Sequence, residues 1–199
     1  TAFTNLQFIA LSSSARAAHD KMFEMMMTSI QTDEARHAQI GQVVLAKLVK
    51  KDKEYVQNLI DKWFWRTSRL FAVITGFSMD YFTPLQAREK SFKEVMDEWI
   101  MDQFLSILEA HGLAKPYYWD SFLDSLEAYH HQVYVSAYTY RATVWFNFVV
   151  PSPDERKWLA EKYPKYWKQY DEIWQQINTR WSEADPGNAD AASALGETY

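Results

Sequence analysis

The chain has 199 residues, 48% of them hydrophobic and 17% aromatic, and a formal net charge of −5 at pH 7. This length is enough for one domain with a substantial core. Charges of both signs are interspersed without a basic stripe, so nucleic acid is not expected as a partner. The absence of cysteine excludes disulfides and thiolate-ligated metals, and it is compatible with the reducing cytoplasm. The sequence shows no signal peptide and no apolar run long enough for a membrane span, so no membrane is expected as a partner.

Because the sequence begins at Thr1 rather than Met, we expect a piece of a longer protein. Only 5 glycines and 6 prolines interrupt it, which suits long helices. Neither an internal repeat nor strand alternation of useful length is evident. The sequence therefore predicts an all-α fold. Its first helix is expected from Thr1 to about Ala18, with a break at His19-Asp20.

The second predicted helix runs from Met22 to about Lys50 and carries an apolar stripe with spacings of three and four residues. The members of the stripe are Phe23, Met26, Met27, Ile30, Gly41, Val44, Leu45 and Leu48. Glu34 and His37 continue this stripe through its middle, so a carboxylate and an imidazole fall on a face that should be buried. Burying an unpaired carboxylate is costly or forces it to protonate. A bound metal removes that cost, and Glu-x-x-His on a bundle helix is the spacing used by carboxylate-bridged di-iron and di-manganese sites.

A plainer interpretation of Glu34 and His37 stands beside the metal site. Glu-x-x-His is a short and common pattern, and most copies lie on solvated helix faces. A lone histidine on an apolar face is usually a hydrogen-bonded core residue. The motif alone leaves both interpretations open.

The third predicted helix begins after Asp52, a good N-cap, and extends from Tyr55 to about Ile74. Arg66 and Arg69 lie within its aromatic cluster, where we expect them to stack on rings. Gly76 follows, and we expect it to mark a close helix crossing or a bend.

Thr83-Pro84 predicts the start of a helix that runs to His111 and ends at Gly112. Lys115-Pro116 predicts a further long helix, to about Phe146. His130 and His131 lie inside it. Because adjacent helical residues point about 100° apart, we do not expect these two histidines to face one metal, and we interpret each as a hydrogen-bonded structural residue.

Ser152-Pro153-Asp154-Glu155 combines a serine cap, a proline and the glutamate of a capping box, and so predicts a helix start. The segment from Trp158 to Trp181 is predicted to be helical and to be broken in two by Pro164. Residues 182–199 are rich in small and polar residues and are predicted to form a disordered tail.

Six short segments of the chain, beyond the Glu-x-x-His motif, resemble segments of one protein family. They are Phe3-Thr4-Asn5-Leu6-Gln7-Phe8, Ser29-Ile30-Gln31-Thr32-Asp33-Glu34, Arg36-His37-Ala38-Gln39, Met79-Asp80-Tyr81, Ser91-Phe92-Lys93-Glu94 and Glu161-Lys162-Tyr163-Pro164. Through them the chain resembles the large (α) hydroxylase subunit of bacterial multicomponent monooxygenases, the soluble di-iron enzymes that act on toluene, phenol, propane, alkenes and methane. The likeness is greatest to the toluene, propane and alkene branches. It covers nearly the whole chain to about Trp181 and leaves out the tail.

The resemblance implies that residues 1–181 form the C-terminal part of a ferritin-like bundle. In that family the bundle holds two iron ions through four glutamates and two histidines. By this pattern Glu34 and His37 correspond to the second Glu-x-x-His. The other four ligands lie upstream of the position of Thr1 in the family, so the chain corresponds to the C-terminal part of a hydroxylase subunit.

The same pattern implies roles for polar residues near the two ligands. Thr4 corresponds to the family's threonine beside the di-iron centre, which is implicated in oxygen activation and access. Asn5 and Gln31 correspond to polar residues that respond to the effector protein.

The residues that surround Glu34 on its own helix also have expected roles. Asp33 and Arg36 correspond to partners that orient the ligands through hydrogen bonds and charge. Helix geometry places Ile30 one turn and Met27 two turns before Glu34, near an expected substrate pocket. Plain core packing is the alternative for Ile30 and Met27.

The function implied by the resemblance is insertion of one oxygen atom from O2 into a small hydrocarbon, which is an aromatic compound, an alkene or a short alkane. The implied electron source is NADH through a separate reductase, with a ferredoxin in the toluene branch. The implied partners are the remainder of the α subunit, the β and γ hydroxylase subunits and an effector protein. The expected location is the cytoplasm, and this part alone is expected to be inactive.

Two other kinds of protein compete with this interpretation. Another ferritin-like carboxylate protein, such as a desaturase or a ribonucleotide reductase small subunit, would use the same ligand spacing. A non-catalytic helical subunit, or a simple interaction bundle, would explain the many aromatic residues as interface. The intact pair of Glu34 and His37 argues against a metal-free subunit.

Overall fold

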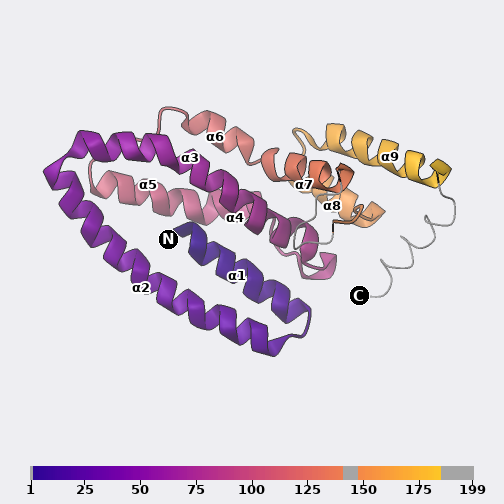
Figure 1. The fold of residues 1–199 in the computed structure, drawn as a ribbon, viewed down its shortest axis with the longest axis horizontal. Coiled ribbons are helices and arrows are strands. Elements are labelled where there is room, and N and C mark those ends of the chain that lie inside the picture. The colour runs from indigo at the N-terminus through magenta and orange to yellow at the C-terminus, as the bar shows by residue number, and fades with distance from the viewer. Residues whose placement is uncertain (1, 141–147, 185–199) are drawn as a thin grey trace. The chain divides into compact units, whose positions relative to one another are not determined.

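The computed structural model describes residues 2–140 and 148–184, and in these ranges the regular structure is helical (Figure 1). The prediction of an all-α fold is confirmed. The α-helices are α1 (Ala2–Ala17), α2 (Lys21–Lys51), α3 (Lys53–Phe77), α4 (Phe92–Val95), α5 (Met101–Ala110), α6 (Trp119–Ser125), α7 (Tyr129–Thr139), α8 (Pro153–Lys162) and α9 (Trp167–Ala184). Two π-helices, η1 (Ser78–Phe82) and η3 (Met96–Ile100), and a 3-10 helix, η2 (Leu85–Ala87), lie between α3 and α5.

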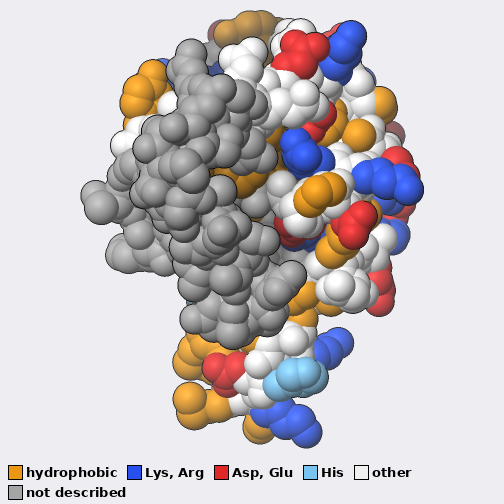
Figure 2. Space-filling view, turned by 90° about the vertical axis from the view of Figure 1, so that its right-hand side faces the viewer, with side chains coloured by type: hydrophobic (Ala, Val, Ile, Leu, Met, Phe, Trp, Pro, Cys, Tyr) orange, Lys and Arg blue, Asp and Glu red, His pale blue; other side chains and the backbone are white. Residues whose placement is uncertain are grey.

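The chain divides into two compact units, residues 1–130 and residues 131–199. Within the described residues, none of the helices is both long enough and apolar enough to cross a membrane. On the described part of the face seen in Figure 2, Lys and Arg side chains are interspersed with Asp and Glu side chains, as expected from the mixed charge pattern of the sequence.

Helices α1 and α2 form an antiparallel pair in the first unit (Figure 1). The break between them is where the sequence predicts it: His19 adopts a left-handed conformation with φ of 58°, and the Asp20 carboxylate accepts a hydrogen bond from the Phe23 N–H at 2.9 Å. The turn is therefore a local event, made by one residue of unusual φ and one N-cap.

The predicted burial of one whole stripe on α2 is only partly right. Met27 is buried, and the half-buried members of the stripe are Phe23, Ile30, Glu34 and Leu45. The prediction is wrong for the exposed members, which are Met26, His37, Gly41, Val44 and Leu48. The reason is a missing neighbour: a Cβ added at Gly41 would meet no atom within 4 Å among the described residues.

Helix α3 supplies the main wall of the core of the first unit. Asp52 caps it as predicted, accepting a hydrogen bond from the Tyr55 N–H at 2.9 Å. The buried core residues are Phe64, Phe71, Ala72, Phe92, Met96, Met101, Trp119, Phe122 and Leu126. Rings interlock around Phe64, whose centroid lies 4.2 Å from that of Phe104 and 4.9 Å from that of Phe122.

The predicted stacking of the two arginines of α3 is confirmed. The Arg66 guanidinium lies 5.3 Å from the centroid of the Trp63 ring. The Arg69 guanidinium lies 4.9 Å from the Trp65 ring and 5.2 Å from the Tyr129 ring, which ties α3 to the start of α7.

The helix predicted to begin at Thr83-Pro84 begins instead at Phe92. Pro84 is extended, with ψ of 140°, and only the short 3-10 helix η2 follows it, so it does not open the predicted α-helix. The start is set by a capping box in which the Ser91 hydroxyl accepts from the Glu94 N–H and the Glu94 carboxylate accepts from the Ser91 N–H. The predicted end is right: Gly112 has φ of 64°, and the Leu113 N–H donates to the Leu108 carbonyl at 2.8 Å.

The single helix predicted from Lys115-Pro116 to about Phe146 is wrong, because a turn at residues 126–128 separates α6 from α7. Glu127 in this turn is buried and forms an ion pair with Lys93 of α4. Asp97, which lies on η3, has a raised pKa because burial disfavours its charged form. The predicted helix end at Phe146 lies outside the described residues.

The second unit has its own aromatic core around α8 and α9. The capping box of Ser152 and Glu155 is present as predicted. Helix α8 ends at Lys162 and α9 begins at Trp167, so the helix is interrupted around Pro164 as predicted. Tyr163 and Trp174 are fully buried. Helix α9 continues to Ala184, and the rest of the predicted tail, residues 185–199, lies outside the described residues.

Candidate functional site

Glu34 and His37 lie one turn apart on α2. The His37 Nδ1 atom is 3.5 Å from the Glu34 Oε1 atom. The Glu34 side chain is 20% exposed and the His37 side chain is 63% exposed. Both donor atoms are therefore on one side of the helix, close enough for one ion to bind both. A carboxylate and an imidazole form a donor set that suits iron.

Asp33 and Arg36, expected to support these ligands, pair with each other. The Arg36 Nη1–H donates to the Asp33 Oδ1 at 2.8 Å, and both side chains are exposed. In the described chain this pair is a surface ion pair of the i,i+3 kind. The predicted role in orienting the ligands stays a prediction.

Two contacts define how α1 lies along α2. The Arg16 Nε–H donates to the Glu24 Oε1 at 2.7 Å, and the Ser12 Oγ lies 3.2 Å from the Thr28 Oγ1. A step of four residues toward the start of α1 is thus matched by a step of four residues toward the end of α2. Helices that rise equally per residue keep such a register along their shared length.

This register brings the predicted residues of α1 to the predicted ligands. Eight residues beyond Ser12 the helix reaches Thr4, and eight residues beyond Thr28 the partner helix reaches Arg36. Thr4 and its neighbour Asn5 are therefore level with the turn that carries Glu34 and His37. The positions of the Thr4 and Asn5 side chains lie outside what the structure describes.

Three further predicted residues precede Glu34 on α2. Met27 is buried, and Ile30 and Gln31 are half-buried. This burial is compatible with core packing as well as with the edge of a substrate pocket. Their expected roles stay predictions.

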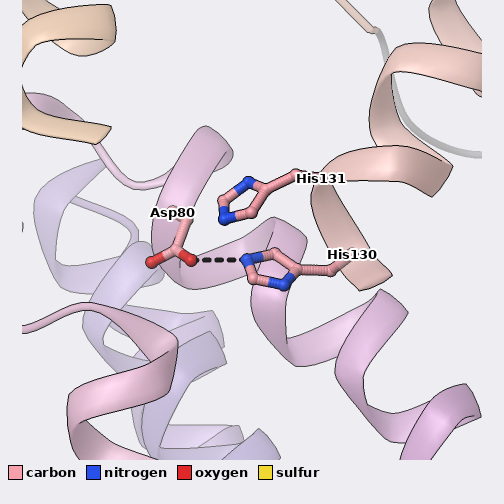
Figure 3. Close-up of side chains that lie close together, drawn as sticks. All are labelled: Asp80, His130 and His131. Carbon is pink, nitrogen blue, oxygen red and sulfur yellow. Dashed lines mark hydrogen bonds and ion pairs between the residues drawn. The ribbon is translucent and has the colours of Figure 1, made fainter. Parts of the chain in front are cut away.

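A second polar pair, which the sequence interpretation missed, lies in the core of the first unit. Asp80 of η1 and His130 at the start of α7 are both fully buried. The His130 Nε2 lies 2.7 Å from the Asp80 Oδ2, and the dashed line in Figure 3 marks this bond. The second carboxylate oxygen accepts a hydrogen bond from the Phe92 N–H at 2.9 Å. One aspartate thus joins η1, α4 and α7.

The His130 ring is held by its surroundings as well as by Asp80. A Cβ added at Gly76 would lie 2.7 Å from the His130 Cδ2, so only glycine fits where α3 passes the ring. The predicted close approach at Gly76 is confirmed. The Phe92 ring meets the imidazole edge-on, with centroids 5.2 Å apart. The expectation that His130 is hydrogen-bonded is confirmed, and its structural role stays a prediction.

His131 belongs to the second unit. Its buried ring packs edge-on against the Tyr163 ring, with centroids 4.2 Å apart. A sequence signal for the Asp80 pair did exist. Asp80 is the one charged residue between Phe77 and Phe82, a position that is favourable only when a partner satisfies the carboxylate.

Comparison with known proteins gives consistent matches. The first 52 residues match the family model described as "Methane/Phenol/Alkene Hydroxylase". The chain is 44% identical over 182 residues to the oxygenase component subunit alpha of the alkene monooxygenase system of Xanthobacter autotrophicus, covering 88% of this chain and 36% of that protein. It is 34% identical over 173 residues to the phenol 2-monooxygenase oxygenase component DmpN of Pseudomonas sp. CF600, covering 84% of this chain and 33% of that protein.

A solved structure supports the same assignment. The X-ray crystal structure of xenon-pressurized phenol hydroxylase from Pseudomonas sp. OX1 matches with a TM-score of 0.80 at 28% identity, covering 92% of this chain and 38% of that one. The prediction of a helical, ferritin-like fold is confirmed. The chain spans about a third of the length of the curated relatives it matches. Over that part, the chain belongs to the methane, phenol and alkene hydroxylase family and corresponds to a portion of its α subunit.

Proposed function

We propose that this chain is part of the hydroxylase component of a soluble di-iron monooxygenase. The enzyme inserts one oxygen atom from O2 into a hydrocarbon, which is an aromatic compound, an alkene or a short alkane, and the other atom becomes water with two electrons from NADH and two protons. The observation that carries the proposal is that the segment matched by the family model contains the predicted ligands. Residues 1–52 contain Glu34 and His37, with donor atoms 3.5 Å apart, and Thr4 level with them.

Glu34 and His37 fit one part of a di-iron centre. A hard anionic carboxylate and an imidazole suit iron, and the two atoms lie on one side of α2. When bound, two iron ions would supply the activation of O2 for attack on a C–H, C=C or aromatic bond. The remaining ligands come, in this proposal, from the remainder of the α subunit.

The other residues of the chain then have defined tasks. The apolar side chains of Met27 and Ile30 exclude water and face the hydrocarbon. The Thr4 hydroxyl holds a proton near the site. Asn5 and Gln31 respond to the effector protein.

Asp33 and Arg36 hold the ligand-bearing turn of α2 by their mutual ion pair, at 2.8 Å. The exposed apolar side chains of α2 are covered, in this proposal, by the remainder of the α subunit. The β and γ subunits, the effector protein and a ferredoxin or reductase that brings electrons from NADH complete the system, which we place in the cytoplasm. The desaturase, ribonucleotide reductase and non-catalytic alternatives are less favoured, because the relatives named above are monooxygenase components.

The 199-residue chain alone is expected to bind little iron and to show no turnover, because it carries two of the six expected ligands. The check is iron content after anaerobic reconstitution with ferrous iron, measured beside the full-length subunit. Two iron ions per chain, together with hydrocarbon oxidation, would contradict the assignment of the remaining ligands to other parts of the protein.

Thr4→Ala in the full-length enzyme is expected to keep its iron but to change coupling or product selectivity. The reason is that, in this proposal, Thr4 corresponds to the family's threonine beside the centre and is not a metal ligand. Product formed per NADH consumed and the ratio of product isomers are the measurements, with the exposed Thr67→Ala on α3 as the matched control. Loss of iron in Thr4→Ala, or coupling and selectivity equal to those of the control, would remove the proposed role.

A further inference from the structure

Three consecutive serines, Ser12, Ser13 and Ser14, lie in the second half of α1. Ser12 is buried, Ser13 is exposed and Ser14 is half-buried. Successive helical residues turn by about 100°, so Ser12 and Ser14 point to nearly opposite sides of α1. The Ser12 hydroxyl meets Thr28 of α2 at 3.2 Å, and the Ser14 hydroxyl meets Thr83, which follows η1, at 2.9 Å.

The direction of the bond between Ser12 and Thr28 follows from the number of hydroxyl hydrogens. The Thr28 hydroxyl donates to the Glu24 carbonyl at 2.9 Å, so its single hydrogen is in use. Ser12 is therefore the donor to Thr28. The Thr83 hydroxyl donates in the same way to the Ser78 carbonyl.

The Ser14 hydroxyl donates to the Ala10 carbonyl at 3.0 Å, and its oxygen lies 2.9 Å from the Thr83 hydroxyl oxygen. Each of the two serines of α1 thus meets a threonine hydroxyl that is itself bonded to a backbone carbonyl of its own segment. Ser12 ties α1 to α2, and Ser14 ties α1 to η1 on the other side.

The buried apolar side chains described in this region of α1 are small. They are Ala10 and Ala15, with Leu11 half-buried between them, and alanines form lower ridges than large side chains do. Low ridges oppose rotation and sliding of a helix less than high ones. Two hydrogen bonds on opposite sides oppose both movements.

We propose that Ser12 and Ser14 are positioning residues that fix the rotation and the axial position of α1, and thereby keep Thr4 level with the turn of Glu34 and His37. This inference rests on the proposed function. Ser12 and Ser14 are eight and ten residues from Thr4, about 12 and 15 Å along the helix axis, so they act through the helix and do not touch the reacting atoms.

The test uses the full-length hydroxylase with its electron-transfer partners and compares the double variant Ser12→Ala/Ser14→Ala with Ser13→Ala. The double variant is expected to lose about threefold or more in product formed per NADH consumed, because a small misplacement of a group at a site is costly. Its iron content is expected to match the control, and its Tm to lie within about 3 °C of the control, because both threonines keep their carbonyl acceptors. Ser14→Thr, which keeps a hydroxyl, is expected to restore coupling to the Ser12→Ala level when it replaces Ser14→Ala in the double variant.

A second measurement reads the register without using activity. Phe8 lies four residues before Ser12 on α1, and Thr32 lies four residues after Thr28 on α2, so the two positions are level. The double variant Phe8→Cys/Thr32→Cys is expected to form a disulfide on mild oxidation when the serines are intact. Disulfide formation is expected to fall by about half or more when the serines are replaced, since two cysteines are bridged only when their Cα atoms lie within about 7 Å. Single-cysteine variants are the controls.

The outcomes separate this proposal from the proposed function. Coupling and cross-linking equal to those of the Ser13→Ala control overturn the positioning role. A loss of coupling that is matched by a loss of iron and of Tm also overturns it, because this is general damage. A full-length wild-type protein that holds no iron and oxidises no hydrocarbon would instead overturn the proposed function, and the cross-linking measurement would still decide whether the serines set the register.

Discussion

His37→Ala in the full-length protein is expected to abolish iron binding and turnover, and Glu34→Ala is expected to do the same. Each variant removes one of the two donor atoms that α2 presents 3.5 Å apart. Loss of a residue that merely orients a ligand lowers metal affinity by about 10- to 100-fold, so loss of a ligand is expected to exceed about 100-fold. In the 199-residue chain without metal, His37→Ala is expected to change the free energy of unfolding by less than about 0.5 kcal/mol, because the side chain is mostly exposed there.

This combination of results separates a ligand from a structural residue. Iron per α subunit and product formation are measured in both variants, with Gln42→Ala, another exposed residue of α2, as the control. Retained iron and normal turnover in His37→Ala would remove the ligand assignment.

Asp80→Ala is expected to lower the free energy of unfolding by about 3–5 kcal/mol, the usual effect of removing one partner of a buried, hydrogen-bonded pair. The substitution leaves the His130 ring and the Phe92 N–H without the acceptor that they share. The ring cannot relax toward α3, because Gly76 already touches it. The result would be a loosened joint among η1, α4 and α7.

Chemical denaturation of the full-length protein, followed by tryptophan fluorescence, measures this effect. Asp102→Ala, at an exposed position of α5, is the matched control and is expected to change the free energy of unfolding by less than about 0.5 kcal/mol. A loss below about 1 kcal/mol in Asp80→Ala would mean that the pair contributes no more than an ordinary hydrogen bond.

Several helix ends were predictable because the cap is made by neighbours in sequence. Asp52, Ser152 and Gly112 each end or begin a helix through groups within a few residues, so the sequence contains the whole interaction. The errors arose where two local signals compete. The prediction used Thr83-Pro84 as the helix start and overlooked the capping box of Ser91 and Glu94, which begins the α-helix, while Thr83 is bonded back to Ser78.

The interior of the molecule was less predictable, because it depends on residues far apart in sequence. Asp80 and His130 are fifty positions apart, and periodicity alone does not join them. Burial on α2 depends in the same way on what lies beside the helix. The stripe was identified correctly as apolar, yet part of it is exposed because the described chain supplies no cover there. The family resemblance, by contrast, depended on short segments of sequence and was confirmed.

Gly41 lies on the exposed side of α2 and indicates what covers that side in the whole protein. A glycine inside a helix is less favourable than alanine by about 1 kcal/mol, and no described atom comes near enough to require a missing side chain here. Its lack of a Cβ becomes useful only if another backbone passes at van der Waals distance. Gly41 lies one turn after His37 on the same row of α2. We therefore expect the tightest crossing of a neighbouring bundle helix at Gly41, directly adjoining the ligand-bearing turn.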